Sequence, residues 1–163
     1  MLIRKIIQKK IGQTLIEILL VAGFLVMVVA AAYILSSQAI KSGSLVRQKE
    51  EATVLASDAL EKITNIRDTN LKNGDDFAKD FPSPSGTSKV EYKDPAHPEE
   101  GFKLESAPSE VITLGSDSFR REIDINVDLT TRIIKVKVTV RYGKSYADQV
   151  ILAKYLTDWK KQP

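Results

Sequence analysis

The 163-residue chain has no cysteine, a single histidine and no proline before Pro82. Without cysteine it can form no disulfide, no thiolate zinc site and no cysteine nucleophile. We interpret His97, in a proline-containing loop, as a solvated residue. The sequence also lacks a phosphate-binding loop and a serine–histidine–acid set, and its adjacent acids, Asp75–Asp76 and Glu99–Glu100, are typical of solvated loops. We therefore expect no enzymatic activity, no metal and no cofactor.

Acidic residues are absent from the first sixteen positions, where four basic residues occur, Arg4, Lys5, Lys9 and Lys10. This asymmetry predicts a cytoplasmic N-terminus by the positive-inside rule. The formal net charge is +3, with 24 Lys and Arg against 21 Asp and Glu. Because four of the 24 lie before Gln13, the remainder has 20 against 21, a net charge of −1. The bulk charge gives no support to nucleic-acid binding, although a local basic patch is possible.

Charge is also missing from Ile18 to Leu35, which follow Glu17. The segment Leu15–Leu35 is apolar all round and at about 1.5 Å per residue spans about 30 Å, one hydrocarbon core. We predict one transmembrane helix. A secretory signal peptide, cut at Ala30–Ala32 or near Ala39, is one alternative, and a plain anchor is another. The segment is longer than a signal-peptide core, and neither alternative accounts for Glu17, because a carboxylate is costly in lipid.

The run Lys9-Lys10-Ile11-Gly12-Gln13-Thr14-Leu15-Ile16-Glu17 resembles the type III signal of type IV pilins and pseudopilins. The resemblance implies that a membrane prepilin peptidase cuts after Gly12 and methylates the new amine of Gln13, where the family usually has Phe. It also implies that Glu17, the fifth residue of the processed chain, neutralises the amine of an adjacent subunit during assembly. The alternative for Glu17 is that its side chain reaches the cytoplasmic interface and pairs with nothing.

Helical periodicity continues beyond the membrane segment. Apolar residues recur at intervals of three and four, with charged residues on the other faces: Leu45, Ala52, Leu55, Ala56, Ala59, Leu60, Ile63 and Ile66. We predict a single helix from about Gln13 to about Arg67, whose second half is amphipathic. Ser42-Gly43-Ser44 is its weak point, since glycine disfavours a helix interior. Asn70, Asn73 and Gly74 predict its end.

The C-terminal third alternates with period two, which predicts strands at Phe119–Leu129, Ile133–Tyr142 and Gln149–Leu156. The first presents acids and the second bases on their polar faces, so we expect Lys135, Lys137 and Arg141 to form a cross-strand charge ladder rather than a DNA-binding stripe. Arg121 interrupts the apolar face, which indicates a sheet edge or a contact with the helix. We expect Trp159 to cap the core. Short strands are also expected at Ser88–Lys93 and Gly101–Ser106.

These C-terminal patterns resemble those of minor pilins and small pseudopilins. The matching motifs are Ile66-Arg67-Asp68-Thr69-Asn70, Phe119-Arg120-Arg121-x-Ile123, Val136-x-Val138-x-Val140 and Tyr155-Leu156-Thr157-x-Trp159. The expected fold is α+β, a long helix packed on a small antiparallel sheet, since each has an apolar face to cover. We divide the chain into a leader (1–12), a transmembrane and filament-core helix (13–35), an amphipathic helix (36–67), a loop-rich region (68–118) and a sheet (119–163).

The resemblance implies a minor pilin or pseudopilin, a structural subunit of a type IV filament serving secretion, adhesion, motility or DNA uptake. Its expected partners are the prepilin peptidase, other pilin or pseudopilin subunits, the inner-membrane assembly platform and the lipid bilayer, with nucleic acid not favoured. It would pass from the cytoplasmic membrane to a periplasmic or extracellular filament. The alternatives are a membrane-anchored binding domain that never assembles and a DNA-uptake pilin.

Overall fold

The computed structural model describes the backbone of residues 2–82, 85–96 and 100–158, and the side chains within these ranges except those of residues 2–14 and 85. His97 and Trp159 lie outside the described residues, so their expected roles stay predictions. The chain divides into two units, Met1–Ser44 and Leu45–Pro163. The boundary falls directly after the Ser42-Gly43-Ser44 segment that the sequence marks as weak.

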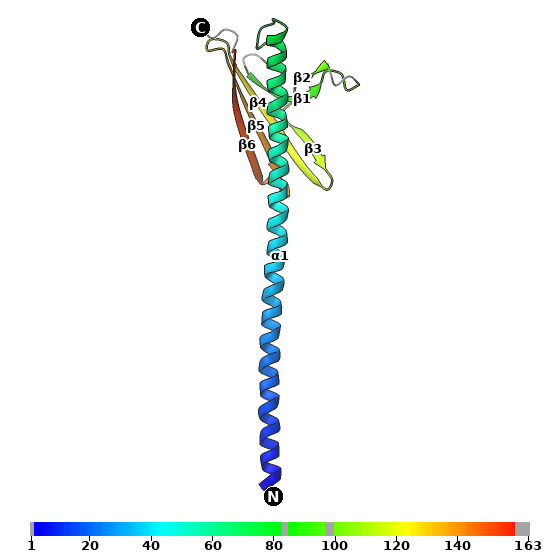
Figure 1. Ribbon diagram of the computed structural model, residues 1–163, viewed down its shortest axis with the longest axis vertical. Helices are drawn as coiled ribbons and strands as arrows, with labels where there is room; N and C mark the ends of the chain where they lie inside the picture. The colour runs from blue at the N-terminus through cyan, green and yellow to red at the C-terminus, as the bar shows by residue number, and fades with distance from the viewer. Residues whose placement is uncertain (1, 83–84, 97–99, 159–163) are drawn as a thin grey trace. The chain divides into compact units, whose positions relative to one another are not determined.

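Helix α1 runs from Leu2 to Lys72 without interruption at Gly43 (Figure 1). It continues beyond Arg67, the expected end, and stops in a Schellman motif. Gly74 has a φ of 80°, the amide of Gly74 donates to the carbonyl of Leu71, and the amide of Asp75 donates to the carbonyl of Asn70 at 2.9 Å. Glycine is the residue that adopts this left-handed conformation without a Cβ penalty, so Gly74 ends the helix.

In the first unit, α1 has almost no buried side chain. From Leu15 to Ser44 every described side chain is exposed except that of Ser37, which is half-buried. Among the described residues α1 is the one helix long and apolar enough to cross a membrane, with a window of mean hydropathy 2.8. The first unit is therefore a transmembrane-capable helix.

The second unit contains a six-stranded antiparallel sheet, with strands in the order β2-β1-β4-β5-β6 and β3 paired to the free part of β4 (Figure 1). The strands are β1 (Ser85–Tyr92), β2 (Phe102–Ser106), β3 (Glu110–Leu114), β4 (Asp117–Asp128), β5 (Ile133–Tyr142) and β6 (Asp148–Thr157). The three C-terminal strands lie within one or two residues of the expected positions. β3 was not expected; it lies in the region interpreted as rich in loops.

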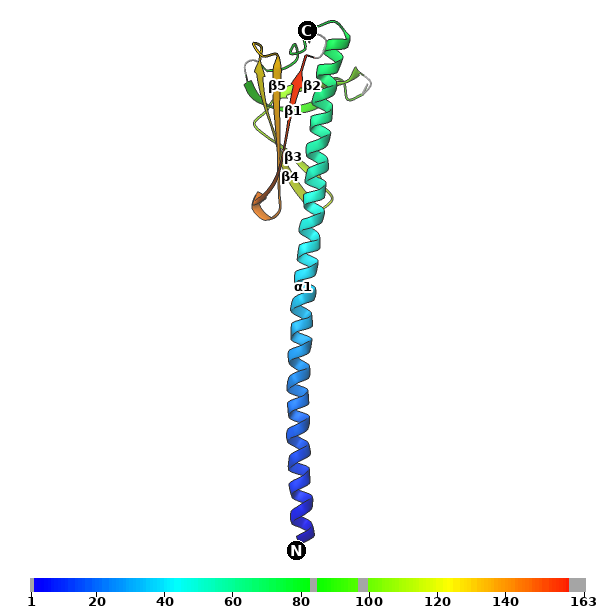
Figure 2. The same ribbon diagram turned by 60° about the vertical axis from the view of Figure 1, so that its left-hand side comes forward.

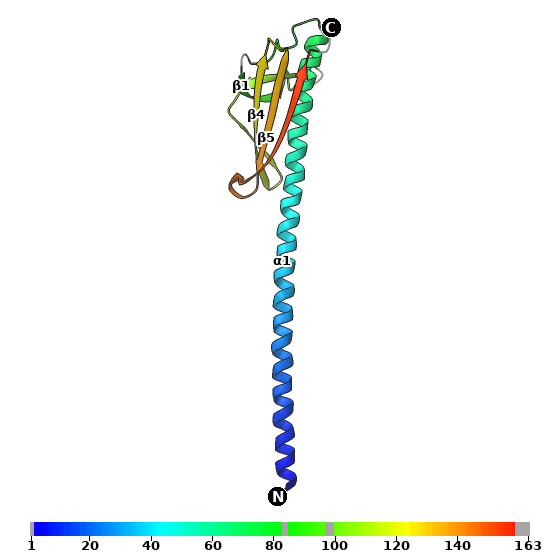
Figure 3. The same cartoon turned by 90° about the vertical axis from the view of Figure 1, so that its left-hand side faces the viewer.

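The amphipathic part of α1 packs on the inner face of this sheet (Figures 2 and 3). Three small residues and two larger ones form its buried stripe, Ala52, Ala56, Ala59, Ile63 and Ile66. Alternate residues of β4 and β5 supply most of the facing surface, among them Phe119, Ile123, Ile125, Ile134, Val136, Val138 and Val140. The fold is α+β, as predicted.

The outer face carries part of the expected charge ladder. Lys137 lies opposite Asp124 with 3.1 Å between Nζ and Oδ2, and Arg141 approaches Glu122 at 3.9 Å. Lys135 departs from the prediction: it lies opposite Asn126, and its Nζ is 5.7 Å from the centroid of the Tyr155 ring.

Arg121 makes a contact with the helix, the second of its two expected possibilities. Its side chain is 5% exposed and donates to Glu110 Oε2 from Nη2 at 2.7 Å and to the carbonyl of Leu55 from Nη1 at 3.2 Å. Asp58 Oδ2 lies 3.6 Å from Nη1. The guanidinium therefore ties α1, β3 and β4 together inside the apolar layer.

We predict that Arg121→Ala destabilises the second unit by about 2–3 kcal/mol, because it leaves Glu110 and the Leu55 carbonyl without their buried donor. Urea unfolding of the full chain in detergent, followed by near-UV circular dichroism, measures this. Arg120→Ala is the matched control: its side chain is on the outer face over Tyr146, and its loss costs under about 1 kcal/mol. Equal effects of the two substitutions would contradict the tethering role of Arg121.

A second prediction concerns the connection between β4 and β5. The hydroxyl of Thr131 and the amides of Thr131 and Thr130 donate to the carboxylate of Asp128 and hold its pKa below its ordinary value of 3.8. A carboxyl with a lowered folded-state pKa stabilises the fold above the unfolded-state pKa, and that contribution disappears as the pH falls through the folded-state value. The difference in urea midpoint between the parent chain and Asp128→Ala should thus be largest at neutral pH and shrink below about pH 4. A difference that is independent of pH would mean that the charge of Asp128 plays no part.

Candidate assembly surface

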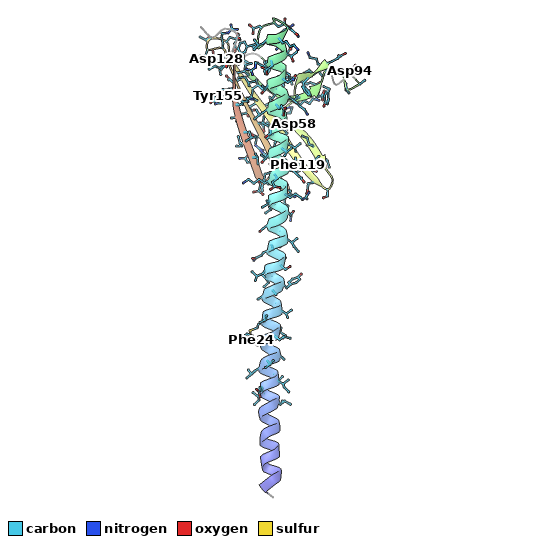
Figure 4. The ribbon with its side chains drawn as sticks, in the orientation of Figure 1. Phe24, Asp58, Asp94, Phe119, Asp128 and Tyr155 are labelled. Carbon is cyan, nitrogen blue, oxygen red and sulfur yellow. The ribbon has the colours of Figure 1, made fainter. Side chains whose placement is uncertain are left out.

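The most unusual surface of the protein is the helical segment Leu15–Leu35. Its large apolar side chains are between 51% and 76% exposed, whereas Ile63 on the packed part of the same helix is 0% exposed. Figure 4 shows these side chains, with Phe24 labelled, extending from the helix into open space. A continuous apolar surface of this extent is not stable against water and marks a membrane or protein contact.

Glu17 is the one charged residue among the described side chains from Leu15 to Ile40, and it is exposed. It lines a shallow depression of about 420 Å³ on the helix surface together with Ile18, Val21, Ala22 and Leu25. Among the described side chains it has no ion-pair partner. A carboxylate beside an apolar depression can neutralise a cation that arrives with an apolar helix.

The predicted processing residues, Gly12 and Gln13, lie in the helical backbone of α1, and their side chains are not described. Gln13 precedes Glu17 by four residues, so the two lie on the same face of the helix one turn apart. Cleavage after Gly12 would place a new amine within one helical turn of the carboxylate. The positions of the three candidate residues are therefore compatible with one local site, and the cut itself remains a prediction.

The sequence interpretation missed a polar clamp where the packed part of α1 begins. Asp117, at the start of β4, accepts hydrogen bonds from Arg47 Nη2 and from Gln48 Nε2 at 2.8 Å, and Arg47 also pairs with Glu51 at 2.8 Å. These bonds raise the pKa of Arg47, the largest cause being the hydrogen bond with Asp117. The i,i+4 spacing of Arg47 and Glu51 was visible in the sequence, but the second partner of Arg47, Asp117, lies 70 residues away and was not.

The basic residues of the outer face do not form a free stripe. Lys137 lies opposite Asp124, and Arg141, whose direct partner is Arg120, reaches Glu122 diagonally at 3.9 Å. The cations of Lys135 and Arg120 lie over the rings of Tyr155 and Tyr146. This arrangement favours the charge ladder over a phosphate-binding surface at these positions.

Comparisons of the chain with protein-family models, with curated proteins and with solved structures give no match. The architecture itself is pilin-like: a long N-terminal helix with an apolar first part, packed on an antiparallel sheet. The candidate site on this architecture is the exposed apolar surface of Leu15–Leu35 with Glu17.

Proposed function

We propose that this protein is a minor pilin or pseudopilin, a structural subunit of a type IV filament. The observation that supports this most directly is a fully exposed apolar helix with a single carboxylate near its start, continuous with a helix that anchors a folded domain. In the membrane, lipid covers the apolar surface. In a filament, the same segments of other subunits cover it.

Processing precedes assembly in this proposal. A prepilin peptidase removes residues 1–12 and methylates Gln13, which also removes the four basic residues of the leader. Their loss removes the charges that hold the N-terminus at the cytoplasmic surface. The processed helix can then leave the bilayer for the filament, guided by the inner-membrane platform. The protein is not an enzyme in this proposal and needs no cofactor.

The proposed processing predicts a mature chain that begins at N-methylated Gln13. Mass spectrometry of the N-terminal peptide from the native host tests this directly. Gly12→Leu should leave residues 1–12 attached, because the cut follows Gly12. The matched control is Gly23→Ala, where an added Cβ meets no atom within 4 Å, and it should be processed normally. An intact Met1, or a start near Ala39, in the parent chain would reject the pilin interpretation.

Assembly should depend on the charge of Glu17. Glu17→Val and Glu17→Gln should both insert into the membrane, because they remove a charge from an apolar helix, and both should reduce incorporation into sheared filaments at least tenfold. Glu17→Asp keeps the charge and should retain most incorporation. Unchanged incorporation of Glu17→Gln, measured by immunoblot of the filament fraction against the membrane fraction, would refute pairing with a neighbouring amine.

A further inference from the structure

The sheet of the second unit has three edge strands, β2, β3 and β6, and of these β3 and β6 lie on opposite sides of the β4–β5 pair (Figure 1). Both edges carry exposed apolar side chains: Ile151 (50%) and Tyr155 (63%) on β6, and Val111 (58%) and Leu114 (42%) on β3. A strand edge with exposed apolar side chains is a template for pairing with another strand.

The register shows which backbone groups these edges offer. β3 and β4 are joined by the two-residue turn Gly115–Ser116, with Gly115 at a φ of 61°, so the pair Leu114–Asp117 that closes the turn is hydrogen-bonded. Hydrogen-bonded and non-bonded pairs alternate along an antiparallel ladder. Val111 and Thr113 therefore direct their N–H and C=O groups away from β4, to the free edge.

The same alternation can be followed across the sheet, because the three ladders from β3 to β6 have no break in register. It leaves Ile151, Ala153 and Tyr155 with their backbone groups directed away from β5. An independent contact agrees: the carbonyl of Thr157, two residues further along, accepts a hydrogen bond from Arg67 Nη1 on α1 at 2.7 Å, so it also points away from β5.

The edges of β3 and β6 are compatible in side-chain face and in strand direction. Val111 lies beside Arg120, and Ala153 lies beside Lys137, so on both edges the residues with free backbone groups have side chains on the outer face. β3 is also antiparallel to β6, since three antiparallel steps separate them. Two copies with the same orientation can thus join β6 to β3 antiparallel, with outer face continuing into outer face. Pairing β6 with β6 would require copies of opposite orientation.

Charge selects one register for this contact. With Ala153 opposite Val111 of a second copy, Lys154 lies opposite Glu110, Leu152 opposite Ile112, and Val150 opposite Leu114. Lys154 belongs to the inner face, opposite Val136, and its Nζ lies 3.0 Å from Thr64 Oγ1, a surface contact. Both hydrogen bonds that Arg121 makes to Glu110 use Oε2. A shift of two residues in either direction places Lys154 or Glu110 against an apolar side chain or beyond the partner strand.

We propose that β6 of one copy pairs antiparallel with β3 of a second copy, with Ala153 opposite Val111 and Lys154 opposite Glu110. This proposal rests on the proposed filament function. It assigns β3 and β6 as the strands of the second unit that join neighbouring subunits. The interface is heterologous: each copy uses one edge to bind a neighbour and keeps the other free. Such a contact can add copies one after another, and it gives an open filament when the rotation between copies does not close a ring.

Cysteine cross-linking in the full-length chain tests the contact, because the parent chain has no cysteine. The Cα atoms of a hydrogen-bonded pair are about 5.5 Å apart, within the disulfide range of about 4.4–6.8 Å. Val111→Cys with Ala153→Cys in one chain, expressed in the native host and treated with a mild oxidant, should give a ladder of dimers, trimers and larger species. Each single variant should remain monomeric. In the control chain with Val111→Cys and Tyr155→Cys, the second cysteine lies two residues, or roughly 7 Å, further along β6. Its yield of cross-linked species should be at least fivefold lower than that of the Val111→Cys, Ala153→Cys chain.

Lys154→Glu added to the Val111→Cys, Ala153→Cys chain should reduce the ladder several-fold, because two carboxylates would then face each other. Sedimentation of sheared filaments separates the two proposals. If filaments form but residues 111 and 153 of neighbouring copies do not cross-link, the edge contact is wrong and the filament function is still supported. The link without filaments supports the contact and rejects the function. Dimers of the Ala153→Cys single variant would show β6–β6 pairing and overturn the contact.

Discussion

The structure depends on one constraint: among the described residues, the large apolar side chains of Leu15–Leu35 are all exposed. Burying a large aliphatic side chain is worth about 1.5–3 kcal/mol, so leaving this segment in water would oppose any stability that a small domain can gain. Some other apolar material must solvate it, either lipid or other copies of the same segment. The pilin-like architecture resolves this by placing the uncovered part of α1 and the folded part in separate units of the chain.

The same helix meets two different requirements through two different residue patterns. From Ile18 to Leu35 it is apolar on all sides, which suits surroundings that are apolar in every direction. From Ala52 onward a single stripe of alanine and isoleucine faces a sheet, and charged residues cover the remainder. Because the folded unit has its own complete core, it does not require any particular environment around the first unit. In the proposed function the subunit passes from a membrane to a filament, and this independence would allow the folded unit to remain unchanged in both.

Much of the fold could be predicted from the sequence, because period-two alternation and the three-and-four spacing are local signals. Ile133–Tyr142 was predicted at its observed bounds. β3 was not predicted, since five residues with polar Glu110 and Thr113 give too short a pattern, and it forms because β4 extends beyond the edge that β1 occupies. Asp117 and the Arg47–Gln48 clamp were missed for a related reason: the contact is between side chains far apart in sequence. The assignment of Gly12 and Gln13 as processing residues comes from the sequence motif alone and stays a prediction.

The contacts that hold β3 in place also bear on the proposed pairing of β3 with a second copy. Arg121 connects Glu110 at one end of β3 to the backbone of Leu55, and Asp117, directly after the turn at the other end, binds Arg47 and Gln48. The hairpin of β3 and β4 is thus held to α1 near both of its ends, although β3 itself is an edge strand with few buried side chains. An edge held in this way loses little conformational freedom when a neighbour binds, which lowers the entropic cost of association. The polar network inside the apolar layer therefore fixes the position of the surface that another subunit would meet.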